Sequence, residues 1–202
     1  MQAGTPSVPP LVLVTDRHET AGRDLVEVVC AALDAGLPAI QLREKDLPGG
    51  QLLALAERLR KATTVRRALL LVNDRVDVAV AVGADGVQLG HGALSVADAR
   101  RLLSPDTLVG VSTHEAVEAN DADFLLFGAV YPTPGKSAVG VAAFRAAVAT
   151  ARPLPMLAIG GITAAQVPEL RAAGAAGVAV IRAILGAPDP AAATRALLVA
   201  AR

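Results

Sequence analysis

The feature that most constrains the fold is an alternation of short apolar runs with longer helical segments. Runs rich in Val, Leu and Ile span residues 11–16, 39–44, 68–73, 86–90, 108–113, 124–130, 155–161 and 177–183. Strands that are apolar on both faces and separated by helices indicate a parallel sheet with both faces covered. Eight such runs in a chain of 202 residues predict an α/β fold made of a single (β/α)8 TIM barrel.

The segments between the runs have the apolar spacing of amphipathic helices. We expect helices over residues 23–36, 50–62, 95–103, 142–151, 164–174 and 189–202, and a further one that begins near residues 73 and 74. Gly36, Gly83 and Gly174 each precede the next strand, where glycine can close a helix in the left-handed conformation. A doubly wound open sheet is the competing fold, but no GxGxxG sequence follows the first run.

Composition and charge favour a small-molecule partner. Lys plus Arg and Asp plus Glu both number 19, and no block of like charge occurs. This balance gives no electrostatic footprint for nucleic acid or an anionic membrane. Charged residues, Gly or Pro also interrupt every apolar run before it reaches the roughly 18 to 20 residues of a membrane-spanning helix.

We expect one domain preceded by a short extension. Residues 1–10 lack the cationic start and apolar middle of a signal peptide, and predict a flexible N-terminal extension. Residues 11–202 form the predicted barrel. The single cysteine, Cys30, lies in an apolar pattern and is expected to pack as a small hydrophobe in a protein of the reducing cytoplasm. The sequence leaves open whether the chain forms a homo-oligomer.

In a barrel of this class, catalytic groups lie at the carboxyl ends of the strands and in the loops that follow. At the end of the second run, alternation places Gln41, Arg43 and Lys45 on one face and Leu42 and Glu44 on the other. An amide and two cations directed at one point suit an anionic ligand. The alternative is a solvated loop in which Glu44 and Lys45 pair with neighbours. Only three lysines stand against sixteen arginines, and two of the lysines lie in strand-end loops.

The later strand ends carry candidate phosphate-binding groups. YPTPGKSAVG supplies Thr133 and Lys136 on a turn whose backbone amides can cradle phosphate oxygens, although a surface turn is an equal alternative. IGGI and GVAVIRA stand where such barrels often bind phosphate on backbone amides, at Gly161 and at Ile181 with Arg182. A simple tight turn also explains the glycines.

Three polar residues at other strand ends have both a structural and a functional interpretation. Asn73 and Asp74 suit the N-cap of a helix, and Asp74 is also a hard oxygen ligand of the kind that Mg²⁺ prefers. His114 can act as an acid or base near neutral pH, or cap the helix that follows it.

Together these blocks resemble the thiamine phosphate synthase family and its relative, the thiazole tautomerase of thiamin biosynthesis. The resemblance runs from about residue 11 to 190 and rests on LVLVTD, QLREKD, LLLVNDRVDVAVAVGADGVQLG, VGVSTHE, DFLLFGAVYPTPGK, AIGGI and AGVAVIRAI. The QLREK, VNDRVD and YPTPGK blocks are specific in combination.

The resemblance implies the joining of hydroxymethylpyrimidine diphosphate to thiazole phosphate, with release of diphosphate and with Mg²⁺ as cofactor. Diphosphate would leave first, and the thiazole nitrogen would capture the pyrimidine cation. By position, the resemblance assigns the diphosphate to Gln41, Arg43, Lys45, Asn73 and Lys136, with help from Thr133. It assigns Mg²⁺ to Asp74, and the thiazole phosphate to Gly161, Ile181 and Arg182.

Three departures from the family pattern keep alternatives open. Ala93 stands where a second magnesium carboxylate is usual, Gly135 where a threonine is usual, and Arg182 where a serine is common. Loss of the metal ligand favours the tautomerase, whose catalytic histidine would be His114. Retention of Lys45 and Asp74 favours the synthase. A barrel that binds thiazole or thiamin phosphates without turnover is a further alternative.

Overall fold

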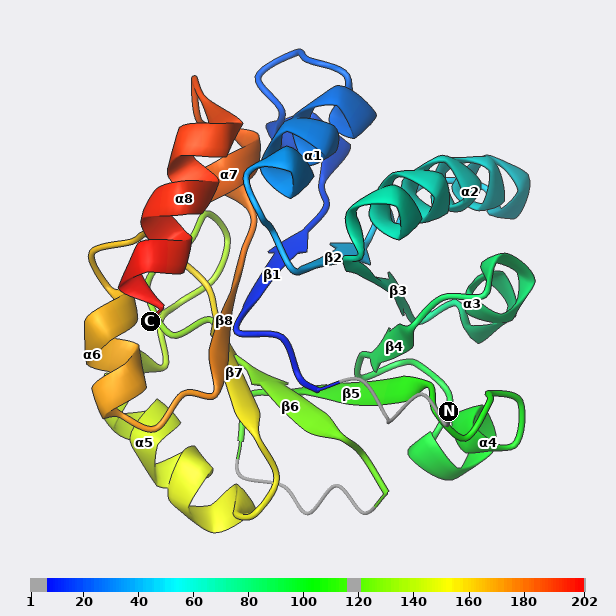
Figure 1. The fold of residues 1–202 in the computed structure, drawn as a ribbon. Helices are drawn as coiled ribbons and strands as arrows, with labels where there is room; N and C mark the ends of the chain where they lie inside the picture. The colour runs from blue at the N-terminus through cyan, green and yellow to red at the C-terminus, as the bar shows by residue number, and fades with distance from the viewer. Residues whose placement is uncertain (1–6, 116–120, 202) are drawn as a thin grey trace.

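The protein is a closed barrel of parallel strands, as the alternating sequence predicts. A computed structural model describes residues 7–115 and 121–201, and the strands pair in the order β1-β2-β3-β4-β5-β6-β7-β8, with β8 closing on β1 (Figure 1). The strands are β1 (Leu11–Val14), β2 (Ala39–Leu42), β3 (Leu69–Asn73), β4 (Gly86–Leu89), β5 (Leu108–Thr113), β6 (Phe124–Phe127), β7 (Met156–Ile159) and β8 (Gly177–Val180). The predicted fold class is therefore confirmed.

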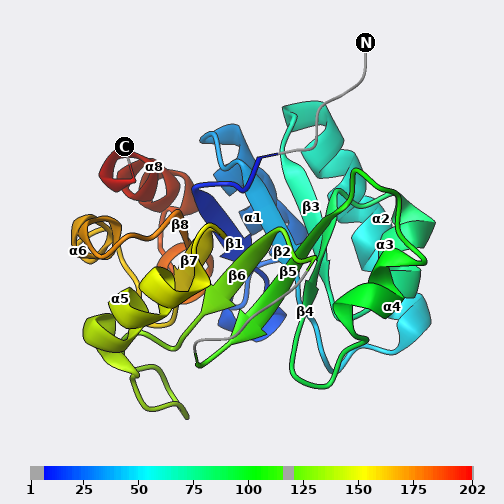
Figure 2. The same cartoon turned by 90° about the horizontal axis from the view of Figure 1, so that it is seen from below.

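Helices surround the barrel, and Figure 2 shows them flanking the central strands on both sides. They are η1 (Arg17–Glu19), α1 (Leu25–Asp34), α2 (Gly49–Arg66), α3 (Val76–Val82), α4 (Val96–Arg100), α5 (Gly140–Ala151), α6 (Val167–Ala172), α7 (Arg182–Leu185) and α8 (Pro190–Ala200). The short helices η1 and α7 lie where the sequence predicted strand ends or loops. Most strands also end two or three residues earlier than predicted, and many of the residues that follow them line the barrel mouth.

The strands separate two apolar clusters. The inner cluster fills the barrel and includes Val12, Ala39, Leu71, Leu108 and Phe124. The outer cluster lies between the sheet and the helices and contains residues of alternate register, such as Leu13, Ile40, Leu70 and Val109. Because both faces of each strand are covered, the runs have no polar face, which explains their uninterrupted apolar character.

The three glycines expected to close helices have the predicted left-handed backbone conformation. Gly36, Gly83 and Gly174 have φ angles of +96°, +59° and +98°, in the region that side chains disfavour. At the opposite ends, Asp24 accepts hydrogen bonds from the backbone N–H groups of Val26 and Glu27 and so caps α1.

Part of the predicted flexible extension is packed. Val8 contacts the inner cluster, Pro9 is buried, and the Pro10 carbonyl accepts a hydrogen bond of 3.0 Å from the Val178 N–H. Residues 7–10 therefore cover the amino end of the barrel, while residues 1–6 lie outside the described residues.

Two further expectations concern burial. Cys30 is partly buried and packs against the outer cluster, as predicted for a small hydrophobe. In the described parts of the chain, no helix has both the length and the apolar character needed to cross a bilayer.

Candidate active site

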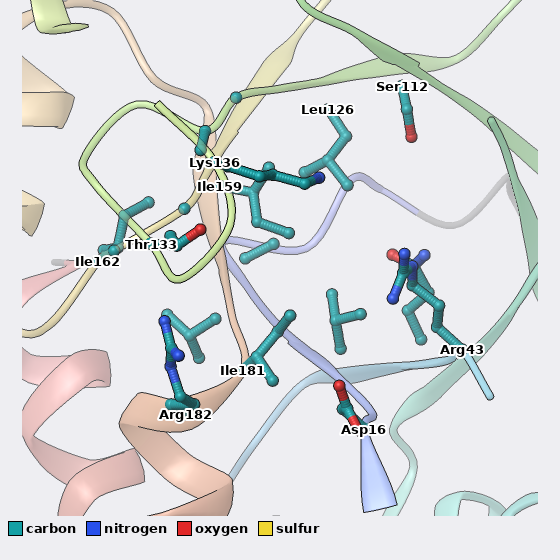
Figure 3. A pocket seen from close by; sticks show the side chains of 18 of the residues that line it. Asp16, Arg43, Ser112, Leu126, Thr133, Lys136, Ile159, Ile162, Ile181 and Arg182 are labelled. Carbon is teal, nitrogen blue, oxygen red and sulfur yellow. The ribbon is translucent and has the colours of Figure 1, made fainter. Parts of the chain in front are cut away.

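One cavity of about 620 Å³ opens at the carboxyl ends of the strands, and the ends of β1 through β8 all contribute to its wall (Figure 3). Every residue that the sequence nominated for binding, catalysis or metal lines this cavity: Gln41, Arg43, Lys45, Asn73, Asp74, His114, Thr133, Lys136, Gly161, Ile181 and Arg182. The barrel thus brings together groups that are up to 141 positions apart in the chain (182 − 41).

Three cations come from two loops of the barrel mouth. Arg43 and Lys45 follow β2, and Lys136 lies between β6 and α5. Within the described residues, none of the three forms a salt bridge with a carboxylate. The Arg43 backbone is fixed by a hydrogen bond of 2.9 Å from its N–H to the Thr15 hydroxyl. Cations that have no internal partner and face a cavity are suited to an anionic ligand.

The Lys136 loop has a defined shape. The Lys136 N–H donates to the Thr133 carbonyl at 3.0 Å, and the Thr133 N–H donates back to the Lys136 carbonyl at 3.4 Å. Gly135 between them has a φ angle of +75°, and a methyl group added there would meet no atom of the described residues within 4 Å. Figure 3 shows Thr133 and Lys136 on this loop with the Lys136 ammonium directed over the cavity.

A row of hydrogen bonds joins the ends of β2, β3 and β4. The Gln41 amide nitrogen donates to the Asn73 side-chain carbonyl at 2.9 Å. The Asn73 amide nitrogen donates to Asp74 Oδ2 at 2.7 Å, and the Gly90 N–H donates to Asp74 Oδ1 at 2.7 Å. The N-cap interpretation of Asn73 and Asp74 is wrong, because α3 begins at Val76, the N-cap residue is Arg75, and no side chain of the described residues caps the helix. Both side chains belong to the cavity wall instead.

The metal expectation rests on Asp74 alone. Among the described residues, no group of three or more His, Cys, Asp or Glu side chains could hold a metal ion. Ala93 packs against the outer cluster and does not line the cavity. Mg²⁺ is commonly held by one or two carboxylates together with substrate phosphates and water. The residues present therefore fit a magnesium ion that is bound jointly with a diphosphate.

A third side-chain amide, that of Gln88, lies on the neighbouring strand β4. Gln88 is buried in β4, and its amide nitrogen donates to the Ser112 hydroxyl at 3.0 Å. Its Oε1 is buried with no hydrogen-bond partner in the described structure. Because Ser112 Oγ accepts this bond, its own hydroxyl hydrogen can be donated into the cavity.

The opposite half of the cavity is shaped by glycines and apolar side chains. Gly160 has a φ angle of +105°, and a side chain there would meet Ala129 Cα at 2.5 Å. Gly161 has a φ angle of +65°, and a side chain there would lie 2.7 Å from the Pro132 carbonyl. These contacts show that packing requires glycine at both positions. A tight turn is therefore enough to explain the two glycines, without a bound phosphate. The adjoining wall is apolar and includes Val14, Leu126, Ile159 and Ala179.

Arg182 is the cation that follows β8 in this second half, separate from Lys136 in the loop after β6. It begins the short helix α7, is exposed, and its guanidinium lies 3.8 Å from the Glu19 carboxylate. Figure 3 shows Arg182 and Arg43 on opposite sides of the cavity, with Ile181 between them in that view. The mouth therefore has two separate cationic regions.

His114 lies just after the end of β5, where it lines the cavity and is exposed. Its Nδ1 forms a hydrogen bond with the Gly128 carbonyl. Since a carbonyl only accepts, Nδ1 carries the hydrogen, and Nε2 of the neutral ring is an acceptor that has no hydrogen-bond partner among the described residues. The alternative role of His114 as the cap of a following helix depends on residues 116–120, which lie outside the described residues.

An ion pair between a buried carboxylate and a partly exposed guanidinium supports the loop that holds Arg43 and Lys45. The Glu44 side chain is 1% exposed and accepts hydrogen bonds from the Arg17 guanidinium at 3.2 Å and the Arg17 N–H at 3.1 Å. The Arg17 guanidinium also binds Asp46, and this hydrogen bond holds the pKa of the Asp46 carboxyl well below its usual range. Glu44 thus pairs with a residue of another loop and points away from the cavity, whereas Lys45 is exposed at the cavity.

The Lys136 loop is anchored in a similar way. The Tyr131 hydroxyl donates to the Glu169 carboxylate at 2.6 Å and so connects this loop to α6. Burial, with help from this hydrogen bond, raises the pKa of Tyr131 to about 12.

The sequence interpretation missed three residues of the cavity wall and one residue that supports it from outside. Arg17, Leu126, Ile159 and Ala179 were not nominated, and neither was the orientation of Asp74 toward Gly90. Strict alternation within the predicted strands would have found the three apolar residues, because inward positions at the carboxyl ends of barrel strands face the cavity. No local pattern signals the Arg17 contact, since its partner is 27 residues away.

Comparison with known proteins identifies the family. Residues 11–184 match the family model described as thiamine monophosphate synthase. A protein of Geobacter sulfurreducens, named as a putative thiamine-phosphate synthase, is 51% identical over 93% of this chain and 92% of its own length. The thiamine-phosphate synthase of Methanoculleus marisnigri is 43% identical over 93% of this chain and 92% of its own length.

Solved structures agree with the sequence relatives. The thiamine phosphate pyrophosphorylase from Pyrococcus furiosus has a TM-score of 0.86 and 37% identity, covering 95% of this chain and 94% of its own. A 3-hexulose-6-phosphate synthase at 23% identity and a TM-score of 0.68, covering 95% of this chain and 99% of its own, shares the fold alone. The arrangement of the cavity, the family model and these relatives lead to one conclusion: the chain belongs to the thiamine monophosphate synthase family.

Proposed function

We propose that this protein is a thiamine-phosphate synthase that joins hydroxymethylpyrimidine diphosphate to thiazole phosphate. The C–O bond between the pyrimidine methylene and the diphosphate breaks, and diphosphate leaves with the bonding electrons. The thiazole nitrogen then donates its lone pair to the resulting cation, which forms the C–N bond of thiamin phosphate. This path requires charge stabilisation on the leaving group more than it requires a nucleophile from the protein.

Arg43, Lys45 and Lys136 are the groups that would stabilise the departing diphosphate, with Asn73 and Thr133 as neutral partners. The absence of internal salt bridges for these cations in the described residues supports the assignment. Gln41 lies deeper than the cations, at 3% exposure on the inner face of β2, so we place it against the pyrimidine ring instead of the diphosphate.

Asp74 is the residue that would hold Mg²⁺ together with diphosphate oxygens. The bound ion supplies positive charge that stabilises diphosphate as a leaving group. The chain's own part in this step is to keep a carboxylate at the cavity wall, through the hydrogen bond from the Gly90 N–H. Ala93 offers no second carboxylate, so we expect the affinity for Mg²⁺ to depend strongly on the diphosphate.

The second half of the cavity would hold the thiazole phosphate. Gly161, Ile181 and the exposed Arg182 line one side of it, away from Arg43. The apolar wall formed by Val14, Leu126 and Ile159 would exclude water from the reacting carbon. The observation that carries the proposal is this pair of separate cationic regions in one cavity, which matches a reaction of two phosphorylated substrates.

The first experiment mixes the purified protein with both substrates and Mg²⁺ and measures thiamin phosphate and diphosphate by chromatography. Product should form, and Lys136→Ala should reduce its rate by roughly a hundredfold or more, as expected when one charge-stabilising group is lost. Lys61→Ala is the matched control, because Lys61 is an exposed lysine on α2 outside the cavity. If the parent chain forms no thiamin phosphate under these conditions, the proposal is contradicted.

The tautomerase is a second candidate because His114 Nε2 has no partner among the described residues and lies at the cavity wall, and because Ala93 stands where a metal ligand is usual. A thiazole carboxylate phosphate would be aromatised by proton transfer, with no diphosphate and no metal. In this case the parent chain would aromatise that compound, and His114→Ala would not, while Lys136→Ala would have little effect. Comparison of these two variants in the two assays separates the candidates.

We further propose that the protein acts on these small molecules in the cytoplasm. Its one cysteine, Cys30, is a free thiol packed beside the outer cluster, as suits a reducing compartment. Fractionation of the source cells, with an activity assay on each fraction, tests this location.

A further inference from the structure

We propose that Asp74 has a second role: through Asn73, it fixes the orientation of the Gln41 amide and thereby decides which ring the cavity accepts. This role rests on the proposed function, because it concerns the pyrimidine substrate. The row of hydrogen bonds at the ends of β2 and β3 supports it, since each side chain in the row depends on the next.

The orientation is set at the Asp74 end. An ionised carboxylate only accepts hydrogen bonds. Its Oδ1 already accepts from the Gly90 N–H, and its Oδ2 faces the Asn73 side chain at 2.7 Å. Asn73 must therefore present its amide nitrogen to Asp74, because its carbonyl oxygen would be repelled there.

The same constraint passes to Gln41. With its nitrogen toward Asp74, Asn73 presents its carbonyl oxygen to Gln41, which donates to it from its own amide nitrogen at 2.9 Å. Gln41 Oε1 is then left without a protein partner among the described residues, on a side chain that lines the cavity. The negative charge of Asp74 thus fixes the orientation of Asn73, and Asn73 in turn fixes Gln41 Oε1 as a hydrogen-bond acceptor that faces the cavity.

A fixed acceptor selects for a donor on the ligand. The pyrimidine of the proposed substrate carries an exocyclic amino group, which can donate to Gln41 Oε1. A ring with a carbonyl in that position would place two acceptors face to face. Gln41 is only 3% exposed, so water cannot easily relieve such a mismatch, and the discrimination should be substantial.

Asp74→Asn should reverse the row. The oxygen of the introduced amide would continue to accept from the Gly90 N–H, and its nitrogen would face Asn73. Asn73 and then Gln41 would each turn by half a rotation, and Gln41 would offer a donor to the cavity. The backbone should accept this change, since Asp74 has a φ angle of +59°, a conformation that Asn tolerates as well as Asp.

The experiment measures binding by calorimetry without metal or phosphate. The ligands are the hydroxymethylpyrimidine alcohol and its 4-oxo analogue, in a buffer that contains a chelator. Neither ligand has a diphosphate, so the metal-binding role of Asp74 does not enter. The parent chain should prefer the amino compound by roughly tenfold or more, as expected from one mismatched buried hydrogen bond. Asp74→Asn should abolish or reverse this preference.

Two further variants keep the result interpretable. Asp16→Asn is the matched control, because Asp16 lines the same cavity outside the row and its carboxylate accepts from the His18 N–H; its preference should equal that of the parent chain. Asn73→Leu cuts the row while Asp74 remains, and should bring the two affinities close together. It also provides the test if Asp74→Asn does not fold.

An unchanged preference in Asp74→Asn or in Asn73→Leu would overturn the inference and leave the proposed synthase intact. Failure of the parent chain to bind either ring would contradict the proposed function and the inference together. A preference of the parent chain for the 4-oxo compound would overturn the inference alone, provided that the parent chain forms thiamin phosphate.

Discussion

The two halves of the cavity are built by different means. On the side of β2 to β5, side chains define the wall: Arg43, Lys45, Asn73, Asp74 and Ser112 all line it. On the side of β6 to β8, the backbone and small or apolar residues define it, with Gly160 and Gly161 in close contact with the neighbouring loop. Substitutions that remove side-chain groups should therefore disturb the first half most, and substitutions that add side-chain groups should disturb the second half most.

The largest effect on the backbone-built half is expected from Gly160→Ala. The added methyl group would meet Ala129 Cα, and the φ angle of +105° disfavours any side chain. We expect a loss of about 2–4 kcal/mol in the free energy of unfolding, the range for overpacking combined with backbone strain. Urea denaturation measures it. Gly50→Ala is the control, because Gly50 lies exposed in α2 with open space around it, and it should be neutral or slightly stabilising.

Removal of a side chain that supports the Arg43–Lys45 loop should lower the free energy of unfolding somewhat less than Gly160→Ala does. Glu44→Ala removes a buried carboxylate that binds the Arg17 guanidinium and N–H. Because Arg17 stays partly exposed and keeps Asp46, we expect a loss of about 2–3 kcal/mol, below the upper range for a broken buried pair. Thermal or urea unfolding measures the loss, with the exposed Glu57→Ala as the matched control. Equal stability of the two variants would show that Glu44 does not support the loop.

Arg182, like Thr133 and Lys136 of the loop after β6, adds a polar side chain to the backbone-built half, and its removal sharpens the comparison. Arg182→Ser should raise the KM for thiazole phosphate by roughly threefold to tenfold, as expected for an exposed cation, and leave the KM for the pyrimidine diphosphate unchanged. Steady-state kinetics with each substrate varied in turn measures both values. A change in the second KM would show that the two cationic regions are not independent.

The smallest effect concerns the anchor of the Lys136 loop. Tyr131 is the only tyrosine in a chain without tryptophan, so its ionisation can be followed directly by ultraviolet absorbance. The native midpoint should lie near a pKa of about 12 and fall to about 10 after unfolding. Because the folded pKa is the higher one, this contribution to stability is complete below pH 10 and is lost as the pH rises through 12.

Glu169→Gln should lower the native midpoint only in part, since burial is the larger cause of the raised pKa and the Glu169 hydrogen bond the smaller. A midpoint that returns fully to that of the unfolded chain would show that burial contributes nothing.

The sequence predicts the fold and the membership of the site better than it predicts the site's internal order. Alternating periodicity identifies the strands, and the rule that strand ends carry function nominates residues such as Arg43 and Lys136, which the structure places at one cavity. Side-chain partners between distant loops follow from three-dimensional packing. For this reason the Arg17–Glu44 pair and the contact of Asp74 with Gly90 could not be predicted.

The closure of the barrel has a consequence for how the chain folds. β1 hydrogen-bonds to β8, with Leu11 beside Val178 and Leu13 beside Val180. During synthesis the open edge of β1 must wait for almost the whole chain before its partner exists, and contacts between such distant segments form slowly. The Pro9–Pro10 segment lies directly before that edge, and proline cannot donate the hydrogen bonds that recruit a foreign strand. The segment that later accepts a hydrogen bond from β8 thus also offers no backbone donor at Pro9 and Pro10 while the barrel is incomplete.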